Sequence, residues 1–373
     1  MSAMRVLFVA PNAPPSIGGV EMHLRMVGPR LARSGIDVQV LTVDVTGVQP
    51  AHEDLDGLRI ERVRGWPQGR DWRIAPGLVR AIGRSGAHVV HVHSYQTFVA
   101  PTALAVAQAA GIPTVMTFHS GGNSGGIRRG LGPLQTLMLA PWLRRARRLV
   151  AVSPFEAALF AKRLRIRQDW IVVIRNGADL PPISQGVTAE AGLVVSLGRL
   201  EAYKGHRRSI LTLARLRLTE PDARLEIIGS GPDEAELRRL ASDLDVADHV
   251  DIRAIDSEDR QGYADALGRA SAVLVLSDYE SQGIAAWEAA NLGRPLVVAR
   301  STALAELVDL GLAVGVDVND GPADIVRAVR SVLAEPRTPP SMTIRPTWDA
   351  TAAALRELYE EVHLHVMPAT KVP

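Results

Sequence analysis

The chain has 373 residues, of which 47% are hydrophobic and 22% charged, and it contains no cysteine. The chain is too long to fold around one compact core, so two domains are expected. The lack of cysteine excludes disulfides, thiolate catalysis and zinc–thiolate sites. The net charge is only +2, yet residues 1–180 hold 22 Lys and Arg against 11 Asp and Glu, and residues 181–373 hold 20 against 29.

The amino terminus predicts a strand and not a targeting segment. Residues Arg5–Ala10 are mostly apolar, but no long apolar region with a small-residue cleavage site surrounds them. No run of about 18 uncharged apolar residues occurs, so we expect no membrane span. We expect a cytoplasmic protein, with peripheral contact at the inner face of the membrane through the basic first domain as an alternative.

Short β-branched runs recur along the chain, each followed by a helical pattern. In the first half they are Arg5–Ala10, Val38–Val43, His88–His93, Thr114–His119, Leu149–Val152 and Ile171–Ile174. In the second half they are Leu193–Leu197, Arg224–Ile228, Val250–Ile252, Ala272–Leu276 and Pro295–Ala299. Apolar strands separated by helices are typical of parallel sheets covered on both faces, so the sequence predicts two doubly wound, Rossmann-like α/β domains.

Two breaks interrupt this alternation. Residues Asn176–Gly186 contain an Asn-Gly turn and two prolines, and Ala334–Ser341 is again rich in proline. A last helix, Trp348–His363, follows the second break and could either return to the first domain or stay with the second. Open parallel sheets bind ligands beyond the carboxyl ends of their strands, so we expect a ligand cleft between the two domains.

Residues that follow strands of the first half are therefore candidates for ligand contact. Gly18-Gly19 opens a helix whose free N–H groups can meet an anion, although the three-glycine dinucleotide fingerprint is missing. His93 and His119 both end strands, and a lone histidine such as His93 is usually structural. His119 precedes the Gly/Ser-rich residues 120–126, which resemble a mobile loop over a site, so both a functional and a structural role are open for it.

Residues Ile127–Val150 combine apolar and arginine-rich segments. In the basic half of the chain, such a segment could contact an anionic membrane or a phosphate-bearing acceptor. The alternative is an ordinary amphipathic helix ahead of a strand.

In the second half, Arg199 and Lys204 follow a strand. The chain has only three lysines against 39 arginines, so a lysine directly after a strand is unusual in this sequence. A guanidinium fork and an ammonium point charge can together hold a diphosphate. The alternative is that Arg199 and Lys204 are solvated charges on a loop and bind no phosphate.

Glycines and carboxylates follow the next strands. Gly229 and Gly231 could let a nucleotide approach the backbone, or could serve the turn alone. Glu280 precedes a helix that begins near Gly283, and Glu288 lies more than one turn inside it, in a mostly apolar stretch. Ionised carboxylates can accept O–H bonds from a sugar or a ribose. Acid–base catalysis, or for Glu288 a pair with an arginine such as Arg300, are the alternatives.

In their order along the chain, these motifs resemble glycosyltransferase family 4, the retaining transferases with the two-domain GT-B fold. The resemblance covers nearly the whole chain and rests on Gly18-Gly19 with VEMHL, TFHS at His119, LGRLEAYKG at Leu197, IIGSGP at Ile227 and Glu280-x7-Glu288. Where the family commonly has Glu-Gly-Phe-Gly, this chain has Glu280-Ser281-Gln282-Gly283.

The resemblance implies a role for each domain. Residues 1–178, completed by the helix 347–373, would bind the acceptor, and residues 179–346 would bind a nucleotide-diphosphate sugar, with a UDP-sugar favoured. The implied catalytic residues are Arg199, Lys204, Glu280 and His119. The implied donor-binding residues are Gly18, Gly19, Gly229, Gly231, Ser281, Gln282, Gly283, Ile284 and Glu288. The implied acceptor residues are His93, Tyr95 and Gln96.

The resemblance also implies a reaction: transfer of a hexosyl or N-acetylhexosaminyl group with retention. Arg199 and Lys204 would neutralise the leaving diphosphate, so we expect no metal ion and no cofactor. The acceptor would be a small sugar or aminocyclitol, or a lipid-linked molecule; nucleic acid is not expected, and no oligomeric state is indicated. A GT-B nucleotide-sugar epimerase or hydrolase, and a non-catalytic nucleotide-sugar-binding protein, are the competing hypotheses.

Overall fold

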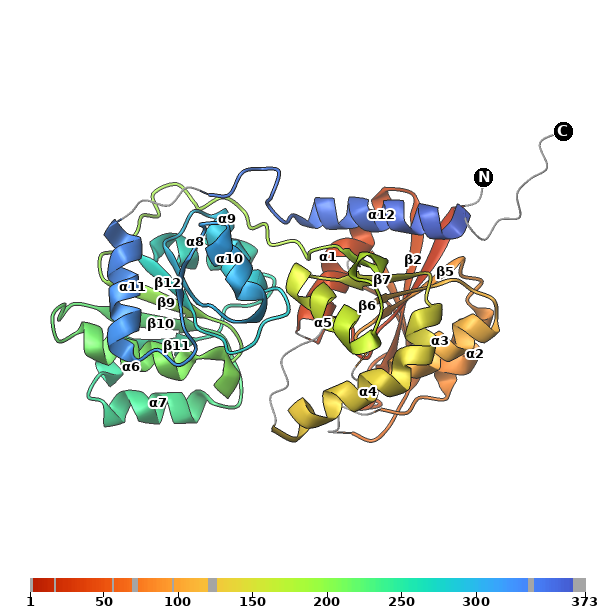
Figure 1. Cartoon of the computed structure of the whole chain (residues 1–373), viewed down its shortest axis with the longest axis horizontal. Helices are drawn as coiled ribbons and strands as arrows, with labels where there is room; N and C mark the ends of the chain where they lie inside the picture. The colour runs from red at the N-terminus through yellow and green to blue at the C-terminus, as the bar shows by residue number, and fades with distance from the viewer. Residues whose placement is uncertain are drawn as a thin grey trace. The chain divides into compact units, whose positions relative to one another are not determined.

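In the computed structural model the chain forms two compact units (Figure 1). The first unit takes in Met1–Ser120, Gly125–Gly177 and Thr347–Pro373, and the second takes in Ala178–Pro346. The structure describes residues 3–16, 18–55, 57–68, 73–95, 97–119, 126–334 and 339–364, with the backbone alone for 126–135. Each unit is a sheet with helices on its faces, and each is described here by itself.

Within the described residues, the first sheet has eight strands in the order β3-β4-β2-β1-β5-β6-β7-β8, all parallel except for the β3–β4 pair. Its strands are β1 Met4–Val9, β2 Ile36–Asp44, β3 His52–Leu55, β4 Leu58–Arg64, β5 Val89–His93, β6 Thr114–Thr117, β7 Arg148–Ala151 and β8 Ile171–Val173. Its helices are α1 Gly19–Arg33, α2 Gly77–Arg84, α3 Val99–Ala109, α4 Gly126–Arg145, α5 Pro154–Leu164 and α12 Trp348–Leu364.

In the described part of the second unit, six parallel strands lie in the order β11-β10-β9-β12-β13-β14. They are β9 Leu193–Leu197, β10 Arg224–Ile228, β11 Val250–Arg253, β12 Ala272–Val275, β13 Leu296–Ala299 and β14 Val314–Val316. The helices are α6 His206–Leu216, α7 Glu234–Asp243, α8 Arg260–Arg269, α9 Ile284–Asn291, α10 Ala305–Asp309 and α11 Pro322–Ala334. None of the helices that the structure describes is long and apolar enough to cross a membrane.

Successive apolar residues of the central strands fill both faces of each sheet. In β1, Leu7 and Val9 belong to one core cluster, whereas Val6 and Phe8 belong to the cluster on the other face. This alternation explains why the central strands are apolar runs, since a parallel sheet covered on both faces leaves no wet side.

The last helix, α12, packs on the first unit. Trp348 and Tyr359 are fully buried, and the Tyr359 hydroxyl lies 2.6 Å from His91 Nδ1 on β5. The Thr351 hydroxyl donates to the Arg175 carbonyl at 2.7 Å. The chain therefore returns, after the second proline-rich break, to the core of the sheet with which it began; α12 lies beside α1 (Figure 1).

Three strands are absent from the sequence prediction: β3, β4 and β14. In β4, Arg59, Glu61, Arg62 and Arg64 interrupt the apolar residues, so it contains no continuous apolar run. β14 has only three residues, with a glycine in the middle. β3 pairs antiparallel at the sheet edge, where the sequence predicts parallel strands alone. The predicted strand Thr114–His119 ends early, because His119 has a left-handed φ of 44°.

Gly177 is where α12 meets the chain leaving β8, and it provides a test of this packing. A Cβ at Gly177 would overlap the backbone nitrogen and indole ring of Trp348. We expect Gly177→Ala to lower the free energy of unfolding by about 1–3 kcal/mol, as overpacking does. Urea denaturation measures this. Gly83→Ala is the control, because Gly83 lies in α2 with open space around it, and it should leave stability unchanged or raise it by up to about 1 kcal/mol. Equal midpoints for the two variants would contradict the packing.

Candidate active site

Two loops part at the carboxyl edge of the second sheet. The chain builds outward from β9 through β10 and β11 on one side and through β12, β13 and β14 on the other. The loops after β9 and β12 therefore diverge, and such a switch point is where open parallel sheets bind ligands. Arg199 and Lys204 follow β9, and Glu280 follows β12.

Lys204 and Glu280 form an ion pair across this switch point. Lys204 Nζ donates to Glu280 Oε1 at 2.7 Å, and each side chain is only 15% exposed. Burial by itself lowers the pKa of Lys204, but the attraction of Glu280 outweighs it, so the pKa lies above its ordinary value. The lysine is therefore a fixed positive charge at neutral pH.

Arg199 is held differently and is more accessible. Its guanidinium contacts Glu201 Oε1 at 2.7 Å and donates to the Tyr203 hydroxyl at 2.9 Å, while its side chain is 56% exposed. Lys204 Nζ lies 5.2 Å from the centre of the Tyr203 ring. The two predicted cations thus lie around one tyrosine, each with its own carboxylate partner.

His206, the first residue of α6, positions the loop that carries the cations. Its Nε2 donates to the Arg199 carbonyl at 3.1 Å, which leaves Nδ1 to accept from the Ser196 hydroxyl at 2.9 Å. Accepting a hydrogen bond at Nδ1 needs a neutral ring. Burial lowers the pKa of His206 from 6.5 to about 4, so the ring is neutral at physiological pH.

The loops after β9, β12 and β13 are hydrogen-bonded into one layer. The Asp278 N–H donates to the Tyr203 carbonyl at 2.8 Å, and the Glu280 N–H donates to the Thr302 hydroxyl at 2.8 Å. Gly205, with a φ of 79°, leaves no room for a side chain, because a Cβ would overlap the Leu276 carbonyl oxygen. The position of Lys204 is therefore set by backbone packing.

Gly229 and Gly231 follow β10 and pack against this layer. A Cβ on Gly229 would overlap the Gly198 carbonyl oxygen, and one on Gly231 would meet the Leu200 backbone. The Leu200 N–H donates to the Ser230 carbonyl at 2.9 Å. The missing side chains thus serve the approach of two loops of the protein itself, which agrees with the conformational alternative to a nucleotide contact.

Glu288, inside α9, is 5% exposed and paired, but not with Arg300. Its Oε1 accepts from Arg260 of α8 at 2.6 Å, while Arg300 pairs with Asp309 at 3.0 Å. Burial raises the pKa of Glu288, and Arg260 and Tyr263 only partly oppose this rise. Helix α9 begins after Gly283, which has a left-handed φ of 78°.

The first sheet has its own switch point, between β1 and β5, and histidines gather there. His93 Nδ1 lies 3.1 Å from His119 Nε2, and His23 of α1 completes a group of three rings whose nitrogens lie within 4.8 Å of one another. Burial, more than the neighbouring histidines, holds the pKa of both His93 and His119 well below its ordinary range. These rings are neutral, and they are the group of described residues that could hold a metal ion.

Other residues predicted for the first unit have different surroundings. Tyr95 is 3% exposed, and its ring packs edge-on against Phe160 in the core, so this ring does not offer the acceptor surface that we expected. Gln96 lies outside the described residues, as do residues 120–125 of the Gly/Ser-rich loop. Gly18 has the Glu21 carboxylate beside it, so an anion approaching the start of α1 would meet a negative charge. Gly19 is open.

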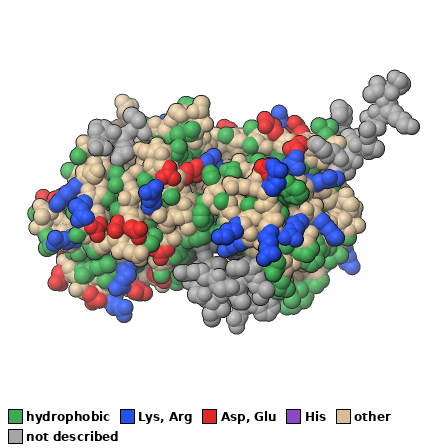
Figure 2. All heavy atoms as spheres, in the orientation of Figure 1, with side chains coloured by type: hydrophobic (Ala, Val, Ile, Leu, Met, Phe, Trp, Pro, Cys, Tyr) green, Lys and Arg blue, Asp and Glu red, His purple; other side chains and the backbone are tan. Residues whose placement is uncertain are grey.

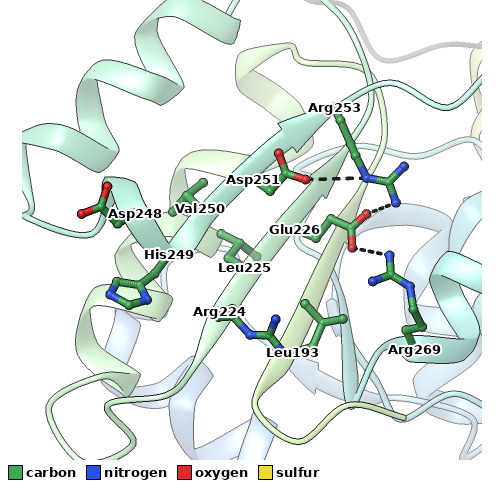
Figure 3. Close-up of a pocket in the computed structure, with 10 residues that line it drawn as sticks. All are labelled: Leu193, Arg224, Leu225, Glu226, Asp248, His249, Val250, Asp251, Arg253 and Arg269. Carbon is green, nitrogen blue, oxygen red and sulfur yellow. Dashed lines mark hydrogen bonds and ion pairs between the residues drawn. The ribbon is translucent and has the colours of Figure 1, made fainter. Parts of the chain in front are cut away.

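A pocket of about 360 Å³ lies elsewhere, near the amino ends of β9 and β10 (Figure 3). In it, the buried Glu226 carboxylate points between Arg253 and Arg269, and its bond to Arg269 is 3.0 Å long. Asp251 also lies 3.7 Å from Arg253, so two carboxylates face the two arginines. Because ligands of open parallel sheets bind at the opposite, carboxyl edge, we place the site at Lys204 and Glu280 and not in this pocket.

Comparison with known proteins settles the family. Residues 17–181 match the family described as Glycosyltransferase Family 4, and residues 184–345 match Glycosyl transferases group 1. The chain is 31% identical to a glycogen synthase of Mycobacterium tuberculosis, over 89% of this chain and 87% of that protein. The chain is a member of glycosyltransferase family 4.

Further matches agree with this membership. This family-4 glycosyltransferase is 26% identical to a GDP-mannose:cellobiosyl-diphosphopolyprenol alpha-mannosyltransferase of Komagataeibacter xylinus, over 98% of the chain and 95% of that protein. Its fold is similar to that of sucrose-phosphate synthase from Thermosynechococcus elongatus, with a TM-score of 0.72 at 19% identity over 97% of both chains. The fold is GT-B, as the sequence predicts.

Several residues around the candidate site were not singled out from the sequence. His206 lies two residues after Lys204, at the start of a helix, so the local sequence could have identified it. Tyr203 lies between the two cations in the sequence and could have been identified in the same way. By contrast, Arg260 lies 28 residues before Glu288 and reaches it only through the packing of α8 on α9.

The buried histidines predict a fold that is sensitive to acid. His206 and His23 each have an ordinary pKa of 6.5 and a folded-state pKa of about 4, with burial as the main cause. Between these values the unfolded chain takes up protons that the folded chain does not, so stability falls as pH falls through this window. Each such histidine contributes a slope of about 1.4 kcal/mol per pH unit.

We therefore expect urea denaturation between about pH 5 and pH 7 to give lower stability at the acidic end, and His206→Gln to reduce the slope by about 1.4 kcal/mol per pH unit. His52→Gln, at an exposed position, controls for the loss of an imidazole. An unchanged slope in His206→Gln would show that its ring is not held neutral by the fold.

Proposed function

We propose that this family-4 glycosyltransferase moves a sugar from a nucleotide-diphosphate sugar to an acceptor hydroxyl with retention of anomeric configuration. The observation that carries the proposal is the partly buried Lys204–Glu280 pair at the switch point of the second sheet, with Arg199 beside it. It places fixed positive charge at the edge where this fold class takes its ligands.

The chemistry follows from that charge. As the bond from the anomeric carbon to the diphosphate oxygen breaks, negative charge grows on the departing diphosphate. Arg199 and Lys204 would exchange their carboxylate partners for phosphate oxygens, and preorganised cations of this kind lower such barriers. The acceptor oxygen then bonds to the anomeric carbon on the same face, and its proton passes to the leaving phosphate. No metal ion is needed for this neutralisation.

The remaining predicted contacts belong to the same proposal. Glu280, with the backbone of Ser281–Ile284, would hold the donor sugar, and Glu288 would accept from a ribose hydroxyl. His119 would contact the sugar near the anomeric centre. We propose uridine as the base, and guanosine is the competitor to test, because the Komagataeibacter relative is named for GDP-mannose.

The acceptor belongs to the first unit in this proposal and is a sugar or a lipid-linked molecule. Lys and Arg side chains gather over the first unit on the face shown in Figure 2, where the second unit mixes both signs. In α4, Leu137 and Met138 are 60% and 67% exposed. An arginine-rich unit with exposed apolar residues suits an acceptor that carries phosphate or lipid, and peripheral contact with an anionic membrane.

Removing either cation tests the mechanism. We expect Arg199→Ala and Lys204→Ala each to lower kcat by about 10²–10³-fold, as loss of one preorganised donor does. Arg207→Ala is the control, because this arginine is 58% exposed on α6 and pairs only loosely with Glu236, at 3.5 Å. Circular dichroism establishes that each variant is folded. Near wild-type transfer in both active-site variants would end the proposal.

Donor and stereochemistry are tested together. We expect UDP to raise the thermal midpoint of the protein more than GDP or ADP at equal concentration, since a ligand of the folded state stabilises by mass action. The sugar from the best donor should appear on an acceptor with unchanged anomeric configuration by NMR. A larger thermal shift with GDP would identify guanosine as the base of the donor. Inverted configuration in the product would contradict the retaining mechanism. Release of free or isomerised sugar alone would favour the hydrolase or epimerase hypothesis.

A further inference from the structure

Tyr203 lies between the two cations of the candidate site and contacts both. Its hydroxyl accepts a hydrogen bond from Arg199 Nη2 at 2.9 Å, and Lys204 Nζ lies over its ring, 5.2 Å from the centre. An ammonium group within about 6 Å of an aromatic ring centre is attracted by the face of that ring. One side chain therefore holds the guanidinium at its polar tip and the ammonium at its ring.

Tyr203 is itself fixed by the surrounding loops. The residue is only 8% exposed, and its carbonyl accepts from the Asp278 N–H at 2.8 Å. It is the middle residue of the short 3₁₀ turn Ala202–Lys204, which ends at Gly205, where no side chain would fit. The place of the ring is therefore set by backbone packing, as it must be in a residue that positions others.

The cations have partners of two kinds. Arg199 and Lys204 each contact a carboxylate at 2.7 Å, from Glu201 and Glu280 respectively. Tyr203, in contrast, is a neutral partner. Burial raises its pKa above the ordinary value, although Lys204 and Arg199 oppose this rise, so the phenol keeps its proton at neutral pH.

This difference matters when a diphosphate binds. A carboxylate and a phosphate oxygen are both anions and compete for the same cation, so one replaces the other. A neutral hydroxyl occupies only one of the several N–H donors of a guanidinium and leaves the others for phosphate oxygens. An aromatic face likewise leaves the N–H donors of an ammonium group to other partners. The contacts with Tyr203 can therefore persist while the carboxylates leave.

We propose that Tyr203 is a positioning residue, a tether that keeps Arg199 and Lys204 in place while their carboxylate partners are exchanged for the leaving diphosphate. The inference rests on the proposed function, in which these two cations neutralise that group. Arg199 depends on the tether more, because its side chain is 56% exposed against 15% for Lys204. A long side chain freed from its carboxylate regains rotamer freedom, and ordering it again costs free energy.

The alternative is that Tyr203 only fills space beneath the loop. In that case its ring is needed and its hydroxyl is not. Tyr203→Phe separates the two roles, since it keeps the ring and removes the hydroxyl. A double-mutant cycle with Arg199→Ala separates them again, because a hydroxyl that acts through Arg199 has nothing to hold in that background.

The test is steady-state transfer by the full chain, with the donor that the thermal-shift comparison selects. We expect Tyr203→Phe to lower kcat by about 10–100-fold, since a misplacement of about 1 Å can cost that much. The donor KM should change far less, because the charge on the departing diphosphate is greatest in the transition state. In the Arg199→Ala background, Tyr203→Phe should change kcat by less than about twofold.

The contact with Lys204 has its own test. Tyr203→Leu also removes the ring, so it should lower kcat by a further factor of about 2–30 relative to Tyr203→Phe, the range for a cation over an aromatic face. In the Lys204→Ala background this further loss should be absent. Circular dichroism and the thermal midpoint establish that each variant is folded, and if Tyr203→Leu is not folded, the Tyr203→Phe cycle decides the matter.

Thr212→Val is the matched control, because it removes a buried hydroxyl from α6 of the same unit. This hydroxyl donates to the Arg208 carbonyl of its own helix at 2.8 Å, so the variant should keep the wild-type kcat and donor KM. Wild-type kcat in Tyr203→Phe, or an equal loss with and without Arg199, would overturn the tether alone. Wild-type transfer by Arg199→Ala would instead contradict the proposed function.

Discussion

The ion pair between Lys204 and Glu280 keeps two opposite charges inside the second unit, and the local loop structure depends on it. Removing an ion from water costs several kcal/mol, which a close counterion with good geometry offsets. Arg199 and Glu201 repeat the arrangement at a more exposed place, 56% and 18% for the two side chains. The four charges sum to zero, so the carboxylates orient the cations until a stronger anion arrives. A diphosphate, with more charge and more acceptor oxygens than a carboxylate, is such an anion.

Backbone packing explains why these charges can be held in place. Gly205 and Gly229 each bring the backbone so close to a neighbouring carbonyl oxygen that a side chain would not fit. Loops in such contact cannot slide independently, and hydrogen bonds such as that from Asp278 to Tyr203 join them further. A catalyst that acts by electrostatics gains from this rigidity, since dipoles and charges that are already oriented need no reorganisation during the reaction.

The sequence predicted the parts of the fold that are governed by local apolar pattern. Strands such as β9 are buried on both faces and therefore appear as apolar runs, whereas β4 carries arginines and was not found. Lys204 and Glu280 were identified separately, but their pairing was not, since 76 residues separate them. Likewise, His23 was present in a motif that carried the family resemblance, yet its contact with Asn176 spans 153 residues. The local sequence pattern identifies individual candidate residues, whereas only the packing of the folded chain shows which of them are in contact.

Buried titratable groups are kept in two ways, and this bears on His119. Lys204 and Glu288 are paired with opposite charges, whereas His206 of the second unit and His119 of the first unit are buried as neutral rings. A neutral imidazole has one N–H and one lone pair, so each of its nitrogens serves one partner. Nε2 of His119 already lies 3.1 Å from His93 Nδ1, so a direct contact between His119 and a donor sugar would use Nδ1 of His119 or would break the contact with His93.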